Sequence, residues 1–428
     1  MGRTKLLRSR RDFLKDLPMI SATLTAATFL VRGIQGAQKF PGGPSGPLPG
    51  TGRILLVVEL AGGCDGLNTI VPYANDFYYQ ERSNLAINPQ SVLPLDDQLG
   101  FHPSLTGFKE LYDSGNMAIV QGVGYPNPNR SHFRSRDIWH TAEAETIGQN
   151  GLLAKYFDSL KGAESLEGIN IGGRVPKAMI SESGSSPSIK RIDTYQLQTD
   201  RRYRKDAANK NAVFQSILSE PPTQFSPFQE YVTQTVLDAT FSAAEILEGQ
   251  DQYSSTIEYP NTTFGRNLKT IAQIIAADIG TTVFYVTIGG FDTHASQAET
   301  TDPQLGTHAN LLETVSLGIK AFWDDMQEMG MENDVLIMSF SEFGRRVKEN
   351  ASNGTDHGTA NQMFLFGGTI YPGLYGEQPS LDPQDLDRIG DLRHNIDFRS
   401  VYSTVLGNWL EVDPVPLIGE PWPLLPFL

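Results

Sequence analysis

Five short apolar runs, each the length of a β-strand, most constrain how this 428-residue chain can fold. Nearly continuous apolar runs are typical of strands buried on both faces of a parallel sheet, and here they are residues 54–60, 117–120, 283–288, 335–340 and 363–366. Between them, apolar residues recur every three or four positions over 268–275 and 311–326, which predicts two amphipathic helices. This β–α alternation predicts an α/β fold with a doubly wound, mostly parallel sheet.

The composition excludes several classes of protein. With 34 Lys and Arg against 49 Asp and Glu, the net charge is −15, so no basic excess is available to neutralise nucleic-acid phosphates. The 39% of hydrophobic residues is ample for a core, and 41 Gly with 26 Pro argue against a long helical rod. Cys64 is the single cysteine, which excludes an internal disulfide or a cysteine-based zinc cluster. Any metal chemistry must therefore use His, Asp and Glu.

The amino terminus has the pattern of an export signal. Arg10 and Arg11 precede a moderately apolar stretch over 17–31 and then a small-residue region, an order that resembles a bacterial twin-arginine signal, with a chance arginine pair as the alternative. The apolar stretch is shorter than the ~20 residues of a membrane-spanning helix. We therefore predict an exported protein, periplasmic or at the cell surface, without a transmembrane helix in the mature chain. The predicted parts of the chain are a signal peptide over 1–37, a linker over 38–52 and one domain over 53–428.

A stretch from about residue 162 to 260 differs from the rest of the domain. It is richer in Ser and other polar residues and contains the basic run 201–205. We interpret it as a polar insertion with a long helix near 228–247. A basic run of this kind is more often a solvated helix face than a site for an anion.

Polar side chains follow several of the predicted strands. In open α/β sheets, ligands bind outside the carboxyl ends of the strands, so these loops are the first place to look for a site. Three of the seven histidines, His132, His294 and His357, lie in such loops. Asp-x-His and Asp-His spacings suit coordination of a divalent ion by oxygen and imidazole, although each residue alone is more often a helix cap or a structural histidine. The predicted metal ligands are Asp65, Asp292, His294, Glu342, Asp356 and His357.

Ser131 stands near the expected start of a helix. Its oxygen would gain from the positive end of the helix dipole if it were a nucleophile or contacted an anion, and it is equally well explained as an ordinary N-cap. The chain has no G-x-S-x-G motif and no P-loop, so the hydrolase triad and nucleotide-binding folds are disfavoured. Cys64 has no neighbouring cation in the sequence to activate it, and Asp65 would raise its pKa.

Five motifs in the chain carry a family resemblance: ELAGGCDGLN at 59–68, FDTH at 291–294, SEFGR at 341–345, DHG at 356–358 and DFRSVY at 397–402. Together they resemble the DUF1501 family, over nearly the whole mature chain. The resemblance implies an alkaline phosphatase-like core, similar to the superfamily of alkaline phosphatases, sulfatases and phosphoglycerate mutases, with two divalent metals at the strand ends.

The same resemblance implies roles for individual residues. Asp65 takes the place of a metal-bridging aspartate and Ser131 that of the nucleophile, while Asp292 with His294 resembles the Asp-His pair of one metal site. His357 falls where the last histidine ligand comes. The sequence departs from the superfamily pattern at 341–342, where Ser-Glu replaces the Asp-His of the second site, so that Asp356 and His357 would supply ligands from a shifted loop. Cys64 also lacks the sequence context from which sulfatases form formylglycine.

The leading functional hypothesis is an exported, metal-dependent hydrolase of a small-molecule or polymeric phosphate or related anionic ester. It would use one or two divalent ions, zinc or else manganese, magnesium or calcium, with Ser131 or a bound water as nucleophile. Arg130 or Arg345 would stabilise charge on the transferring group. The alternative is a non-catalytic envelope or periplasmic binding protein on the same fold, with a possible envelope protein partner, and a metal-dependent isomerase or mutase is a third option.

Overall fold

The computed structural model describes residues 52–160, 167–182, 184–190 and 253–428. The predicted signal peptide over 1–37 and the predicted helix near 228–247 lie outside these residues, as does almost all of the predicted linker. In the described part of the chain, no helix combines the length and the apolar character needed to cross a membrane.

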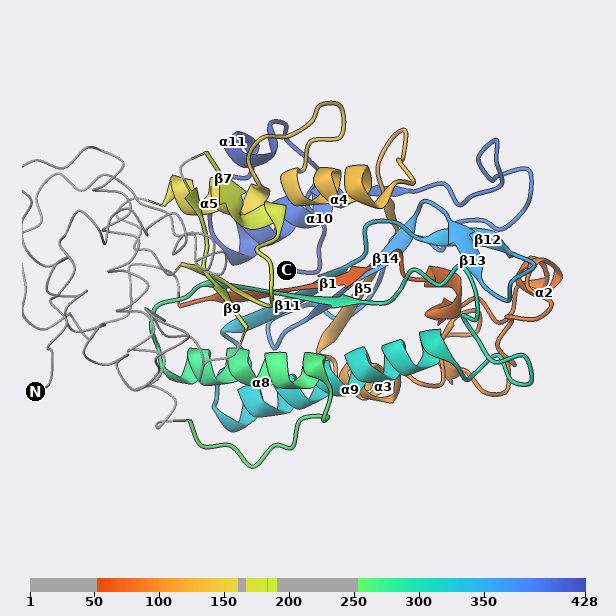
Figure 1. Ribbon diagram of the computed structural model, residues 1–428, viewed down its shortest axis with the longest axis horizontal. Helices are drawn as coiled ribbons and strands as arrows, with labels where there is room; N and C mark the ends of the chain where they lie inside the picture. Colours follow the sequence, from red (N-terminus) through yellow and green to blue (C-terminus); the bar gives the residue numbers. More distant parts are fainter. Residues whose placement is uncertain (1–51, 161–166, 183, 191–252) are drawn as a thin grey trace, which may run out of the picture.

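A nine-stranded sheet forms the centre of the structure (Figure 1). Its strand order is β15-β5-β14-β11-β1-β10-β6-β9, with β16 beside β5, and the strands are β1 (Ile54–Ala61), β5 (Met117–Gly124), β6 (Gly168–Ile171), β9 (Ser188–Ile189), β10 (Val283–Gly289), β11 (Val335–Phe340), β14 (Asn361–Phe366), β15 (Gly373–Tyr375) and β16 (Ile396–Asp397). All pairs are parallel except those of β14, which runs antiparallel to β11 and β5. The predicted α/β fold with a mostly parallel sheet is therefore confirmed.

The reversed direction of β14 follows from the connection that precedes it. A parallel neighbour needs a long crossover, usually a helix. Between β11 and β14 the chain instead forms only the small antiparallel hairpin of β12 (Arg345–Glu349) and β13 (Thr355–His357), and it then returns beside β11. This hairpin lies at the carboxyl end of β11, where a site was predicted.

Helices cover both faces of the sheet (Figure 1). One layer contains α3 (Thr106–Asp113), α8 (Thr263–Ala276) and α9 (Thr307–Glu328), and the other contains α4 (His132–Thr141), α5 (Leu152–Ser159), α10 (Phe398–Thr404) and α11 (Val415–Ile418). Side chains of β1 alternate between the two cores: Leu56 and Val58 pack on the α8 side, whereas Leu55 and Val57 pack on the α4 side. The two predicted helices are α8 and α9, and Thr262 caps α8 by accepting a hydrogen bond from the backbone N–H of Gly265.

Shorter elements complete the described structure. They are η1 (Gly66–Asn68), β2 (Ile70–Val71), α2 (Asp76–Glu81), β3 (Leu93–Pro94), β4 (Gly100–Phe101), η2 (Lys177–Met179), β7 (Ile180–Ser181), β8 (Gly184–Ser185) and the π-helical stretch η5 (Val405–Trp409). The stretch predicted as an insertion over 162–260 includes β6 and β9, which pair with the central sheet. That part of it therefore belongs to the core fold.

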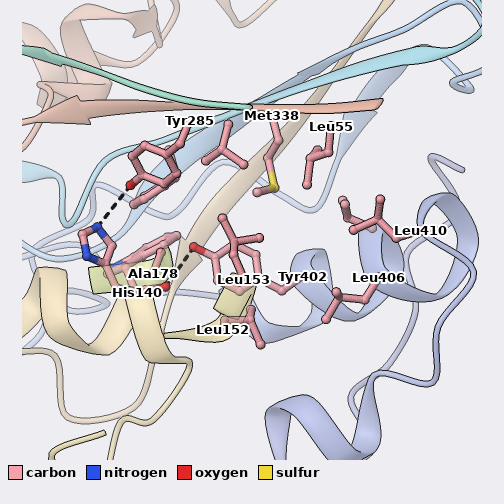
Figure 2. Close-up of a pocket in the computed structure, with 14 residues that line it drawn as sticks. Leu55, His140, Leu152, Leu153, Ala178, Tyr285, Met338, Tyr402, Leu406 and Leu410 are labelled. Carbon is pink, nitrogen blue, oxygen red and sulfur yellow. Dashed lines mark hydrogen bonds between the residues drawn. The ribbon is translucent and has the colours of Figure 1, made fainter. Parts of the chain in front are cut away.

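A cavity lies between the sheet and the α4 layer (Figure 2). Its walls are mostly apolar, with Leu153, Met338 and Leu406 among them, and the side chains of His140 and Tyr285 lie hydrogen-bonded at one end. None of the predicted site residues lines it. The cavity is thus part of the core and not the candidate site.

Candidate functional site

Three imidazoles converge on one aspartate beyond the carboxyl ends of the strands. His132 is the first residue of α4, Asp292 and His294 follow β10, and His357 ends β13. Nε2 of His294 and Nε2 of His357 lie 3.2 and 3.1 Å from Oδ1 of Asp292, and Nε2 of His132 lies 3.3 Å from its Oδ2. His132, Asp292 and His357 offer ligand atoms that all lie within 4.8 Å of one another, as a shared metal ion requires.

The other nitrogen of each imidazole contacts an oxygen. Nδ1 of His357 lies 2.7 Å from the backbone carbonyl of Arg130. Because a carbonyl only accepts hydrogen bonds, Nδ1 of His357 carries the proton and the neutral ring keeps its lone pair on Nε2. Nδ1 of His294 lies 2.9 Å from Oδ1 of Asp356.

Nδ1 of His132 also faces a carboxylate, Oε1 of Glu342, at 2.9 Å. In each of the three rings, an oxygen partner at Nδ1 thus favours a tautomer whose Nε2 can bind a metal. This is the usual arrangement around metal-bound histidines.

Two features of the Nε2 atoms fit a bound cation. Nε2 of His294 and Nε2 of His357 are only 2.8 Å apart, so two lone pairs there repel unless a proton or a cation lies with them. Nε2 of His132 is buried and makes no well-formed hydrogen bond within the described residues, because its neighbour at 3.3 Å, Oδ2 of Asp292, is an acceptor like the lone pair on Nε2. A divalent ion held by His132, Asp292 and His357 would contact Nε2 of both rings, with Nε2 of His294 beside it, 2.8 Å from that of His357.

Neighbouring groups shift the pKa values of several residues in the cluster. Partial burial opposes ionisation of Asp292, but the hydrogen bond from Arg345, together with the neighbouring His357 ring, holds its pKa well below its ordinary value. The hydrogen bond with Glu342 raises the pKa of His132, while burial lowers the pKa of His357. The hydrogen bond from His294 lowers the pKa of Asp356. The cluster therefore combines two ionised carboxylates, Asp292 and Asp356, with three imidazoles, which suits a cation.

Glu342 orients His132 and does not face the centre of the cluster. Its carboxylate is 1% exposed and accepts hydrogen bonds from the backbone N–H groups of Gly62 (2.9 Å) and Gly63 (3.2 Å). Gly62 has a φ of +125°, and a Cβ atom there would lie 2.4 Å from the backbone nitrogen of Asp292. The glycine is thus needed both for the backbone conformation and for the close approach of the loop after β1 to the loop after β10.

The two predicted arginines are occupied by internal contacts. Arg345 is fully buried, and its guanidinium donates to Oδ1 of Asp292 at 2.8 Å and to the backbone carbonyls of Gly62, Gly63, Phe291 and Thr355. The Arg130 guanidinium forms ion pairs with Asp387 and Asp391, at 2.7 and 2.5 Å. Arg345 therefore holds Asp292 in place, and Arg130 contributes its carbonyl to His357.

Asp65 and Ser131 stand apart from the predicted arrangement in different ways. The fully buried Asp65 carboxylate accepts from Nη1 of Arg82 and from Nε2 of Gln297, both at 2.6 Å, and not from the three imidazoles. Burial raises the pKa of Asp65 less than Arg82 lowers it, so Asp65 remains ionised within an internal ion pair. Ser131 is exposed at the N-cap of α4, and its side chain makes no capping hydrogen bond.

The structure brings together Asp292, His294, Glu342, Asp356 and His357 of the predicted ligands, with Glu342 and Asp356 at the Nδ1 atoms of the rings. It adds His132, which the sequence placed in a strand-end loop without a role as a ligand. The signal that could have identified it is its position beside Ser131 at a helix start that follows a strand.

Comparison with known proteins places the chain in a family. Residues 53–418 match the family described as "Protein of unknown function (DUF1501)". The chain belongs to the DUF1501 family. The resemblance predicted from the motifs is thereby confirmed, and no curated protein matches the chain.

Several solved structures are similar to this DUF1501 protein at low identity. The PsFucS1 sulfatase from Pseudoalteromonas sp. is 10% identical, with 86% of this chain and 68% of that chain covered and a TM-score of 0.37. The C-terminal periplasmic domain of EcEptC from Escherichia coli is 11% identical, with 90% and 94% covered and a TM-score of 0.36. A protein of the alkaline phosphatase superfamily from Vibrio parahaemolyticus is 10% identical, with 86% and 70% covered and a TM-score of 0.35.

Proposed function

We propose that this protein is an exported, metal-dependent hydrolase of phosphate or related anionic esters. The observation that carries the proposal is the convergence of the Nε2 atoms of His132, His294 and His357 on Asp292, with an oxygen partner at every Nδ1. Within this cluster, His132, His357 and Asp292 have ligand atoms close enough to share one ion, and two imidazoles with one carboxylate are a set that catalytic zinc sites use, with the fourth position open. Magnesium and calcium prefer oxygen ligands, so the set favours zinc, with manganese as the next candidate.

The arrangement supports one ion more than two. Asp65 would have to contribute to a second site, but its carboxylate is neutralised by Arg82. When bound, the divalent ion would polarise an ester oxygen and lower the pKa of a water. The protein's own part is to hold the three rings in the required tautomer, through Glu342, Asp356 and the carbonyl of Arg130.

Two groups beside the rings could take part in hydrolysis. The side chain of Asp292 is 46% exposed, so its ionised carboxylate can orient an attacking water by accepting its proton in a hydrogen bond. Ser131 precedes His132 and is exposed, so its hydroxyl is the alternative nucleophile. In the Ser131→Ala variant, retained turnover would assign attack to water, and lost turnover with retained metal would assign it to the hydroxyl.

One observation favours a second candidate, a non-catalytic binding protein that keeps the metal. Both arginines predicted to stabilise transferred charge are held by internal acceptors, Arg130 by Asp387 and Asp391 and Arg345 by backbone carbonyls and Asp292. Both guanidinium groups thus donate to acceptors within the protein, which disfavours their binding to charge that develops on a substrate.

Metal analysis with an activity screen tests the proposal. The mature protein, purified without chelator or a histidine tag, should hold one equivalent of zinc or manganese, and it should hydrolyse aryl phosphate or aryl sulfate esters. The His132→Ala/His357→Ala variant should lose both properties, whereas Glu313→Ala, which removes an exposed carboxylate on α9, should keep them. Absence of metal from the native protein would refute the proposal, and metal without turnover on any ester would favour the binding protein.

The export part of the proposal rests on the sequence and has its own test. Replacing Arg10 and Arg11 by Lys keeps the charge of the segment but removes the arginine pair. The proposal predicts that the wild-type chain is recovered from the periplasmic or surface fraction of its host and that the double variant stays in the cytoplasm. Equal distribution of the two proteins would contradict it.

A further inference from the structure

A third arginine lies beside the three imidazoles and is only partly occupied. His132 and Arg136 are one turn apart on α4 and so lie on the same side of the helix. The Arg136 guanidinium donates from Nε and Nη2 to the two carboxylate oxygens of Glu59, at 2.6 and 3.0 Å. Its side chain is 38% exposed, and these contacts leave Nη1 without a partner among the described residues.

The surface next to Arg136 is open towards the cluster. Thr287 and Gly289 of β10 are exposed and lie on the same face of the strand, two residues apart. Thr287 and Arg136 share an acceptor, because the Thr287 hydroxyl donates at 3.1 Å to the same oxygen, Oε2 of Glu59, that accepts from Nη2 of Arg136. A Cβ atom on Gly289 would meet nothing within 4 Å. From there the chain reaches Asp292 three residues later, so exposed residues lead from Arg136 to the imidazoles.

The surroundings of Arg136 differ from those of the other two arginines. Arg345 is fully buried, and two carboxylates hold the Arg130 guanidinium. Arg136 has one bidentate partner, Glu59, which fixes the plane of the guanidinium by hydrogen bonds along one edge. The opposite edge carries the N–H groups of Nη1, and a planar guanidinium fork matches the oxygens of phosphate and sulfate.

We infer that Arg136 is the residue that binds the anionic group of the substrate, next to the three imidazoles. This inference rests on the proposed hydrolase function and narrows it to esters whose phosphoryl or sulfuryl oxygens can contact the metal centre and Nη1 of Arg136 together. Glu59 has two effects on that contact, since it orients the guanidinium and offsets part of its charge. Removing the charge of Glu59 while keeping its shape should therefore strengthen anion binding.

Calorimetric titration of the full mature chain with inorganic phosphate and with inorganic sulfate tests the inference. We expect Arg136→Gln to weaken binding by about tenfold, which corresponds to loss of one charge-assisted hydrogen bond. Glu59→Gln should strengthen binding several-fold, an effect that a purely structural role of the pair would not produce. Arg136→Lys should lie between, because it keeps the charge and loses the fork. Arg266→Gln, an exposed arginine on α8, is the matched control.

Each titration is made with metal-loaded and with chelator-treated protein, and metal content is measured in parallel. This separates the two proposals: absence of metal from the wild type refutes the proposed function, while the ratio of wild-type to Arg136→Gln affinity still reports on Arg136. Equal affinity of wild type and Arg136→Gln would overturn the inference, as would weaker binding in Glu59→Gln with an unchanged unfolding midpoint. Tighter binding of phosphate than of sulfate would identify phosphate esters as the substrate class, and the reverse would identify sulfate esters.

Discussion

Replacing Glu342 by Gln should weaken metal binding, although in the structure its carboxylate lies at Nδ1 of His132 and not among the atoms that face the proposed ion. The carboxylate accepts from the N–H groups of Gly62 and Gly63 on one side and faces Nδ1 of His132 on the other. In the Gln variant, the amide oxygen can keep the backbone hydrogen bonds. The amide NH₂ then faces Nδ1, which must become an acceptor, so the proton of His132 moves to Nε2 and removes the lone pair needed by the metal.

The size of the effect follows from these contacts. One charge-assisted hydrogen bond is lost, a contribution of about 1.5–3 kcal/mol. Changes of this kind around metal-bound histidines lower metal affinity by about 10- to 100-fold. The corresponding change at His294, Asp356→Asn, should cost less, because the Asp356 side chain is 50% exposed and water can replace it.

Competition with a chromophoric zinc chelator measures both affinities on the full chain. Glu313→Gln on α9 is the control for loss of a carboxylate, and urea unfolding of the metal-free proteins shows whether the fold is kept. Unchanged zinc affinity in a folded Glu342→Gln protein would refute the tautomer argument. A larger loss for Asp356→Asn than for Glu342→Gln would refute the role given to burial.

Three further predictions concern buried charge and the helix start. Burial lowers the pKa of His308 to about 4 and that of His102 to about 3, so the unfolded chain binds more protons than the folded chain below pH 6.5. The free energy of unfolding should therefore fall by up to about 1.4 kcal/mol per histidine for each pH unit between pH 6 and 4. Urea unfolding of the metal-free protein measures this slope, which should be smaller in His308→Gln. Arg82→Met leaves Asp65 as an unpaired buried charge and should cost about 3–5 kcal/mol in the same assay, and wild-type stability would contradict the ion pair. Ser131→Ala should keep both the metal content and the unfolding midpoint, because the side chain makes no capping bond.

The fold was largely predictable because its central strands are buried on both faces. The five apolar runs became β1, β5, β10, β11 and β14. β6 escaped prediction because its four residues include Gly168 and Asn170, which do not form an apolar run. Asn170 is buried in a hydrogen bond with Ser188 of β9, a contact between segments that no local pattern in the sequence reveals.

The candidate site was predictable only as far as loop position decides it. Asp292, His294 and His357 follow or adjoin strands whose ends meet, so their convergence could be expected. The direction in which each side chain points could not be predicted from loop position, and it is this direction that separates Asp65 from the cluster. Its partner Arg82 lies 17 residues away, at the end of α2, and only the tertiary fold brings the two together.

The difference between the two aspartates explains why one strand end is suited to an ion and the other is not. A buried charge is tolerated when it is paired, and Asp65 is paired within the protein by Arg82. Asp292 is also paired, by Arg345, but it remains half exposed and faces three Nε2 atoms whose lone pairs have no donor of their own when the rings are neutral. The carboxylate after β1 is thus neutralised internally, whereas the imidazoles around Asp292 are arranged to suit the proposed cation. Because three of the four groups are imidazoles, that cation should leave as pH falls and the rings take up protons.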